Sequence, residues 1–147
     1  MKRLMALGAT VLLLGSVMTG LADEPSGDAP RDGVFLHISH GKDDPHRLLM
    51  ALNMANMMAE DHDVLVYFDI AAVNVVLKDA EEIALAPFPS SKQSLDALRS
   101  RKVTLMACPT CLKVAGRSKE DLAEGVQIAD KSTFFSFTTG RIVTLDY

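Results

Sequence analysis

The two cysteines of the chain stand three residues apart, in the segment LMACPTCLKVAG that spans residues 105–116. They are the only cysteines among the 147 residues, so any thiol chemistry of this protein involves Cys108 and Cys111. A C-x-x-C pair can form a disulfide, contribute two ligands to a metal, or act as a reactive thiol with its resolving partner. A closed zinc site needs two further ligands, which other parts of the chain would have to supply.

The position of the pair favours a reactive thiol. The apolar run KVTLMA (102–107) predicts a buried strand that leads into Cys108, and Pro109 is typical of the first position of a helix. A thiol at a helix start lies near free amides, which lower its pKa. Cys111 follows about one helical turn later, where it can resolve a mixed disulfide or a persulfide on Cys108. A purely structural disulfide would close only a short loop and would stabilise the fold little.

Short apolar runs alternate with amphipathic stretches along the chain. The patterns predict strands over 33–41, 63–70, 102–107, 126–129 and 141–147. They predict helices over 43–60, from 71, over 92–101, from 109, over 118–125 and within 131–140. This alternation is typical of an α/β fold, in which helices on both faces of a mostly parallel sheet make a three-layer sandwich.

Parallel strands joined by right-handed crossovers place their carboxyl ends at one edge of the sheet. Three of the predicted ends carry polar or reactive groups, namely 39–41, Asp69 and Cys108. His40 is the histidine closest to a strand end, so it is the candidate for proton transfer or for pairing with a thiolate. The alternative is that His40 is an ordinary loop residue. His37 lies inside a strand, where we expect it to pack or to lie on a sheet face.

Methionines are dense on the predicted helix 43–60, at positions 50, 54, 57 and 58. Such residues most often fill a core or an oligomer contact. Outside the cytosol, thioether, thiolate and imidazole ligands also suit Cu(I). The alternative function is therefore a copper-binding protein in which Cys108 and Cys111 act with histidine or methionine ligands. The thiol hypothesis needs no cofactor.

The amino terminus has the plan of a secretory signal peptide. Lys2 and Arg3 precede an apolar stretch, and small residues end it near Ala22, so we expect cleavage after residue 22. Residues 23–33 are rich in Asp, Pro and Gly and predict a flexible lead-in, followed by one domain over 34–147. Export predicts a periplasmic location, where disulfides are permitted.

The charge balance argues against two classes of partner. The formal net charge is −4, and loss of Lys2 and Arg3 with the signal makes it more negative. An acidic domain without a basic stripe is poorly suited to nucleic acid or to an anionic membrane surface.

Three segments together resemble the DsrE/DsrF-like family over about residues 34–147. They are HISHGKDDPHRLLMAL (37–52), DVLVYFDIAAVNVVLKDA (63–80) and VTLMACPTCLKVAGRSKEDL (103–122). The resemblance implies a small α/β sandwich with a mainly parallel sheet of about five strands, assembled into trimers or hexamers. In the sulfur-relay branch of that family, a cysteine just after a central strand carries sulfur as a persulfide, and Cys108 occupies that position. Cys111 is outside the minimal relay motif, and relay proteins are cytoplasmic whereas this chain carries an export signal.

The leading hypothesis is thus a periplasmic thiol or sulfur carrier rather than a turnover enzyme. Cys108 accepts sulfur or forms a mixed disulfide, Cys111 resolves it, and His40 stabilises the thiolate. A sulfur donor or acceptor protein and further copies of the chain are the expected partners.

Overall fold

A computed structural model describes residues 30–147; the predicted signal peptide and most of the predicted lead-in lie outside the described residues. Five strands form one sheet in the order β4-β3-β2-β1-β5, and all neighbouring strands are parallel. The strands are β1 (Gly33–Ile38), β2 (Asp63–Phe68), β3 (Thr104–Ala107), β4 (Val126–Ile128) and β5 (Ile142–Asp146). The predicted α/β architecture with a parallel central sheet is confirmed.

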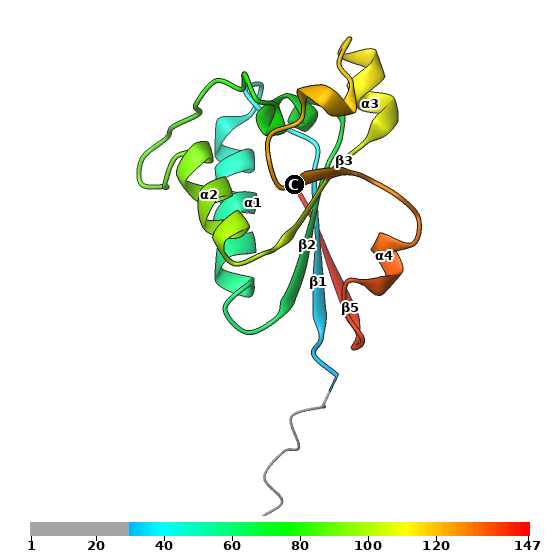
Figure 1. The fold of residues 1–147 in the computed structure, drawn as a ribbon. Helices are drawn as coiled ribbons and strands as arrows, with labels where there is room; N and C mark the ends of the chain where they lie inside the picture. Colours follow the sequence, from blue (N-terminus) through cyan, green and yellow to red (C-terminus); the bar gives the residue numbers. More distant parts are fainter. Residues whose placement is uncertain (1–29) are drawn as a thin grey trace, which may run out of the picture.

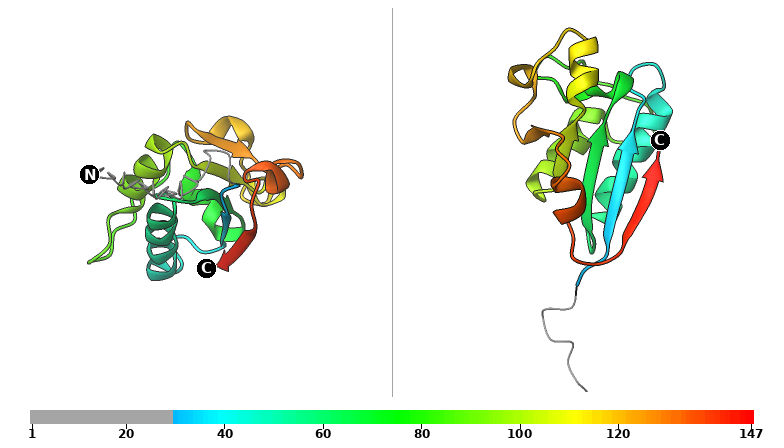
Figure 2. Two further views of the ribbon diagram at one scale, coloured as in Figure 1. Left: turned by 90° about the horizontal axis from the view of Figure 1, so that it is seen from below. Right: turned by 90° about the vertical axis from the view of Figure 1, so that its right-hand side faces the viewer.

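The helices cover the two faces of the sheet unequally. Helices α1 (Pro45–Met58) and α2 (Ser91–Ser100) pack side by side on one face, and the short α4 (Thr133–Ser136) lies on the other (Figure 1). Figure 2 (right) shows α4 in front of the sheet and α1 and α2 behind it. Helix α3 (Pro109–Val114) and two 3₁₀ helices, η1 (Ile70–Val76) and η2 (Lys119–Asp121), lie at the carboxyl edge.

Strand alternation gives the two faces different contents. Toward α1 and α2, the strands contribute side chains that are almost wholly buried, among them Leu36, Ile38, Val66, Phe68 and Leu105. The opposite face, here called the α4 face, carries the intervening residues Phe35, His37, Leu65, Tyr67 and Met106. Leu65 and Met106 are buried there, whereas Phe35, His37 and Tyr67 are only partly covered. The main hydrophobic core therefore lies on the side away from α4.

Local capping signals explain where the two long helices begin. Asp44 caps α1, because its carboxylate accepts a hydrogen bond from the Arg47 amide at 3.0 Å and Pro45 occupies the first turn. Ser90 caps α2 in a capping box with Gln93. After α2, Lys102 adopts a left-handed φ of 59°, so β3 starts at Thr104 rather than at residue 102 as predicted.

The prediction of a helix over 118–125 is wrong in its length, because only residues 119–121 are helical. Only the single turn η2 forms, because Leu122 makes an antiparallel bridge with Leu77 and the Ala123 amide donates to the Val76 carbonyl at 2.9 Å. These bonds to a distant segment replace the hydrogen bonds that would continue a helix.

The folded part begins slightly earlier than the predicted lead-in allows. The Arg31 carbonyl accepts a hydrogen bond from the Thr138 hydroxyl, and Asp32 forms an ion pair with Arg141. These contacts join the start of β1 to the start of β5, which no local pattern could indicate.

The α4 face leaves apolar side chains in solvent at the edge of the sheet. Phe135 is 73% exposed, and Ile142, which shares this face by its pairing with Gly33, is 43% exposed. The predicted trimer or hexamer would give such side chains a partner, and it stays a prediction. Among the described residues, no helix combines the length and the apolar character that crossing a membrane requires.

The capping box of α2 provides a test of this account. Ser90→Ala is expected to lower the free energy of unfolding by about 1 kcal/mol, because a buried hydroxyl that caps the helix and contacts Glu82 is lost. Urea denaturation followed by circular dichroism measures the change. The matched control is Ser118→Ala at the exposed start of η2, where a loss of less than about 0.5 kcal/mol is expected. Equal losses at the two positions would contradict the account.

Candidate functional site

Cys108 stands at the junction that the sequence predicted. The β2–β3 pairing continues one residue past β3, because the Cys108 amide donates to the Phe68 carbonyl at 2.9 Å. Pro109 then begins α3 with Cys108 as its N-cap residue. The Cys108 Sγ accepts a hydrogen bond from the Cys111 amide at 3.4 Å. A strand end and a helix start together therefore position the thiol.

The register of the sheet decides which side chains surround Cys108. Side chains alternate along a strand, so Cys108 continues the α4 face that carries Met106. One row on this face crosses four neighbouring strands and contains Asp146, His37, Tyr67 and Met106. Asp69 follows Tyr67 by two residues and so continues the same face beyond the end of β2. The site thus collects residues that are up to 109 positions apart in the chain.

Both thiols are free and partly exposed, and their environments differ. Burial alone would raise the pKa of Cys108, but hydrogen bonds from the Tyr67 hydroxyl, the Cys111 thiol and the amides of Cys111 and Thr110 outweigh it, and the pKa is lowered. Burial and the hydrogen bond to Cys108 raise the pKa of Cys111. Cys108 is therefore the thiol that ionises first, with Cys111 as its hydrogen-bond donor.

Ile70 brings a strained backbone to the cysteine pair. It adopts a φ of 45°, a left-handed conformation that is unfavourable for a β-branched residue, and its side chain is 66% exposed. In this conformation its backbone hydrogen bonds to the Cys111 thiol and lowers the pKa of that thiol against the other effects. The strained backbone of Ile70 thus lies where it contacts the Cys111 sulfur.

Aromatic packing holds Tyr67 in place. Its ring lies 5.2 Å from that of Phe134 in α4 and 6.3 Å from that of Phe35, as centroid distances. The imidazole of His37 stacks on it at 5.6 Å. Burial raises the pKa of Tyr67, and the neighbouring Cys108 raises it further. The Tyr67 hydroxyl therefore stays protonated at neutral pH and can donate a hydrogen bond to the Cys108 sulfur.

His37 lies between two carboxylates on the same face. Its Nδ1 is 3.0 Å from Asp146 Oδ1, and its Nε2 is at an ion-pair distance of 2.9 Å from Asp69 Oδ2. Burial alone would lower the pKa of His37, but the two carboxylates outweigh it and the pKa is raised. The two carboxylates thus stabilise the charged form of the His37 ring, which lies beside Tyr67 in the row of side chains next to Cys108.

His40 has a different environment from the one predicted. Its Nδ1 bonds Asp43 Oδ2 at 2.6 Å, and its Nε2 lies 3.1 Å from an Arg47 nitrogen at the start of α1. Both ring nitrogens are thus engaged with the α1 side, and no hydrogen bond of the described residues links His40 to Cys108. The histidine that the structure connects to the cysteine pair is His37, through Tyr67 and Asp69.

The comparisons with known proteins agree with the fold. The sequence profile of the DsrE/DsrF-like family matches residues 32–139. The chain belongs to the DsrE/DsrF-like family. A comparison with curated proteins finds no match.

Solved structures share the fold of this DsrE/DsrF-like chain. YchN of E. coli is similar with a TM-score of 0.61 and 20% identity, over 78% of this chain and 99% of that one. MTH1491 of Methanobacterium thermoautotrophicum, a protein of unknown function, is similar with a TM-score of 0.53 and 22% identity, over 78% of this chain and 99% of that one. At these identities the likeness establishes the fold alone.

The copper alternative requires histidine or methionine ligands beside Cys108 and Cys111. Within residues 30–147, no three His, Cys, Asp or Glu side chains gather closely enough to hold a metal ion. The methionines of α1 belong to the opposite side of the sheet, where Met54 and Met58 pack against the main core. Copper binding by Cys108 and Cys111 stays a prediction.

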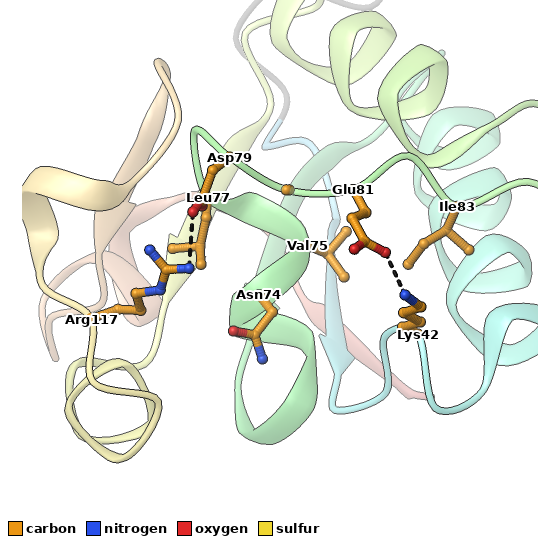
Figure 3. Close-up of a pocket in the computed structure, with 9 residues that line it drawn as sticks. Lys42, Asn74, Val75, Leu77, Asp79, Glu81, Ile83 and Arg117 are labelled. Atoms are coloured by element: carbon orange, nitrogen blue, oxygen red, sulfur yellow. Dashed lines mark hydrogen bonds and ion pairs between the residues drawn. The ribbon is translucent and has the colours of Figure 1, made fainter.

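A pocket of about 340 Å³ lies at the carboxyl edge between η1 and the loop that follows it. Figure 3 shows two ion pairs at its rim, Lys42 with Glu81 and Arg117 with Asp79, with Asn74 and Val75 between them. Gly41 approaches η1 closely there, since a Cβ would lie 3.1 Å from the Ala71 carbonyl oxygen. Neither cysteine lines this pocket, so its volume does not enclose the reactive sulfur.

Three residues of the site were missed by the sequence analysis. Tyr67 and His37 could have been found from strand alternation, because they share a face with Met106 and hence with Cys108. Asp146 gives no local signal, since only the pairing of β1 with β5 brings it to His37. Asp69 and Cys108, in contrast, lie at neighbouring strand ends as predicted.

The role of Tyr67 can be tested by removing one oxygen atom. Tyr67→Phe is expected to raise the pKa of Cys108, because the thiolate loses a hydrogen-bond donor while the aromatic packing remains. The pH dependence of iodoacetamide alkylation at Cys108 measures this pKa. Tyr147→Phe, at the only other tyrosine of the chain, is the matched control and is expected to leave the profile unchanged. An unshifted profile for Tyr67→Phe would exclude the hydroxyl as a donor to sulfur.

Proposed function

We propose that this protein is a periplasmic thiol or sulfur carrier in which Cys108 holds a sulfane sulfur atom. The observation that carries the proposal is the donor set around Cys108. The Cys111 amide donates to Cys108 Sγ at 3.4 Å, and the Tyr67 hydroxyl, the Cys111 thiol and the Thr110 amide also lower the pKa of this partly exposed cysteine. Membership of the DsrE/DsrF-like family supports a sulfur-relay or redox role for this position.

The loading step is a transfer of sulfane sulfur between thiols. The Cys108 thiolate attacks the terminal sulfur of a donor persulfide, R–S–SH. A new S–S bond forms to Cys108, the S–S bond of the donor breaks, and the donor leaves as the thiolate R–S⁻. The product is Cys108–S–SH, and no external oxidant or reductant is needed. A thiolate of lowered pKa is available for this attack at neutral pH.

Unloading can follow two routes, which differ in the attacked atom. An acceptor thiolate that attacks the outer sulfur of the persulfide takes it and restores the Cys108 thiolate. If the Cys111 thiolate attacks the inner sulfur instead, a Cys108–Cys111 disulfide forms and hydrosulfide leaves. An external dithiol must then donate two electrons to reduce that disulfide. The raised pKa of Cys111 delays this second route until the Cys111 proton is removed.

A carrier fits the site better than a turnover enzyme. Cys108 and Cys111 are both partly exposed, and neither lines the 340 Å³ pocket at the carboxyl edge. An open thiol suits exchange with the thiol of another protein. Exposed apolar residues next to the pair, Ile70 and Val114, give such a partner a contact surface. Periplasmic location and assembly into a homo-oligomer are part of the same proposal.

Mass spectrometry after polysulfide treatment tests the proposal. The protein is reduced, freed of reductant without oxygen, treated with polysulfide and digested. We expect a gain of about 32 Da, one sulfur atom, on the peptide that contains Cys108. In Cys111→Ser the persulfide is expected to last longer than in the wild-type chain, because the internal attack is lost.

The matched variant is Cys108→Ser, which keeps Cys111 as the single thiol. Sulfur loading of Cys111 is expected to be slower than loading of Cys108 in the wild-type chain, because burial still raises the pKa of Cys111 when Cys108 is replaced. Sulfur loading of Cys111 at the same rate in Cys108→Ser, or no loading of Cys108 in the wild-type chain, would refute the proposed roles.

A further inference from the structure

We infer that His37 is a positioning residue for the cysteine pair: its imidazolium pairs with Asp69 and so keeps the carboxylate charge from opposing the Cys108 thiolate. The inference deepens the proposed function, since it concerns the reactivity of the same thiol. It assigns a role to three residues of the α4 face, His37, Asp69 and Asp146.

The geometry gives His37 two unlike partners. Asp146 Oδ1 lies 3.0 Å from Nδ1, and the Asp146 side chain is 70% exposed. Asp69 Oδ2 lies 2.9 Å from Nε2 in an ion-pair contact that is not aligned as a hydrogen bond, and the Asp69 side chain is only 18% exposed. Water screens Asp146 well and Asp69 poorly. The pairing with His37 therefore matters most for the charge of Asp69.

Asp69 has few other groups that could neutralise its charge. Its Oδ1 is buried and finds no hydrogen-bond partner among the described residues. Its side chain does not cap η1, which begins at the next residue. The same carboxylate lies near the thiols and the tyrosine, where its charge raises the pKa of both Cys111 and Tyr67. Without His37, a poorly screened negative charge would thus act directly on the site.

The aromatic stack fixes the positively charged ring relative to the sulfur. His37 stacks on Tyr67 at 5.6 Å, and the Tyr67 hydroxyl donates to Cys108. The titratable groups that face His37 are Tyr67 of β2, Asp69 just after β2, and Asp146 of β5. Helix α4 contributes the apolar Phe134, which packs against Tyr67. All the acidic neighbours thus favour the imidazolium, which is the form that offsets Asp69.

The test is the pH profile of Cys108 alkylation in a Cys111→Ser background, where Cys108 is the single thiol. His37→Gln keeps a donor toward Asp69 and removes the positive charge. We expect a higher apparent thiol pKa and alkylation at pH 7 that is slower by roughly three- to tenfold, which corresponds to about half to one pKa unit. Circular dichroism and thermal unfolding of each variant verify that the fold is retained.

A double-mutant cycle separates the electrostatic role from a merely structural one. If His37 acts together with Asp69, then His37→Gln has little effect in an Asp69→Asn background, because the imidazole there loses the carboxylate that favours its charged form. The matched control is His62→Gln. His62 also pairs with an aspartate, Asp61 at 2.5 Å, but at the opposite end of β2, roughly 20 Å from the thiol. That substitution is expected to leave the profile unchanged.

Two results would overturn the inference. One is an unchanged thiol pKa in His37→Gln, and the other is a shift of the same size with and without the Asp69 carboxylate. If His37→Gln does not fold, the Asp69→Asn variant is the test. The pKa of the Cys108 thiol is expected to fall in Asp69→Asn, and an unchanged or higher pKa refutes the inference. The readout is thiol ionisation and not persulfide loading, so failure of the sulfur-carrier proposal would leave this result interpretable.

Discussion

The parallel pairing of β2 with β3, in which Phe68 lies opposite Ala107, is the constraint on which the site depends. One hydrogen bond beyond that pair, from the Cys108 amide to the Phe68 carbonyl, sets the thiol beside the end of β2. Tyr67 and Asp69 then flank it from the same face. A slip of one residue would send every side chain of a strand to the opposite face, so the register of this pair decides whether the cysteine meets its donors.

Stability and reactivity lie on different sides of the sheet. The side chains that are almost fully buried on the α1 and α2 side supply a continuous core, which tolerates a thin cover on the α4 face. On that face, α4 contributes Phe134 to hold Tyr67 and leaves the thiols partly exposed. A thicker layer of helices on this face would bury the cysteines and raise their pKa. If the layer were absent, Tyr67 would be free to move. The short helix is a compromise between these two requirements.

The sequence was a good guide to features that depend on neighbours in the chain. Asp44 with Pro45, and Ser90 with Gln93, are local caps, and the elements they begin were predicted. The strand ends at Asp69 and Cys108 followed from the parallel topology. His40 was chosen over His37 because it lies closer to a strand end, but distance along the chain ignores the face. His40 bonds Asp43 and Arg47 on the α1 side, and His37 reaches the site because β5 returns beside β1. That return spans more than a hundred residues, and no local pattern encodes it.

The unequal ionisation of the two thiols sets the order of the proposed steps. Burial acts on both sulfurs in the same direction, so it cannot distinguish them. The distinction comes from which sulfur receives hydrogen bonds: two amides at the start of α3, the Tyr67 hydroxyl and Cys111 itself all donate to Cys108. A protonated Cys111 stabilises the nucleophile first and becomes a nucleophile only after its own proton leaves. In the proposed mechanism, the two cysteines of the C-x-x-C pair therefore act in succession, and the backbone at the strand–helix junction favours Cys108 as the first nucleophile.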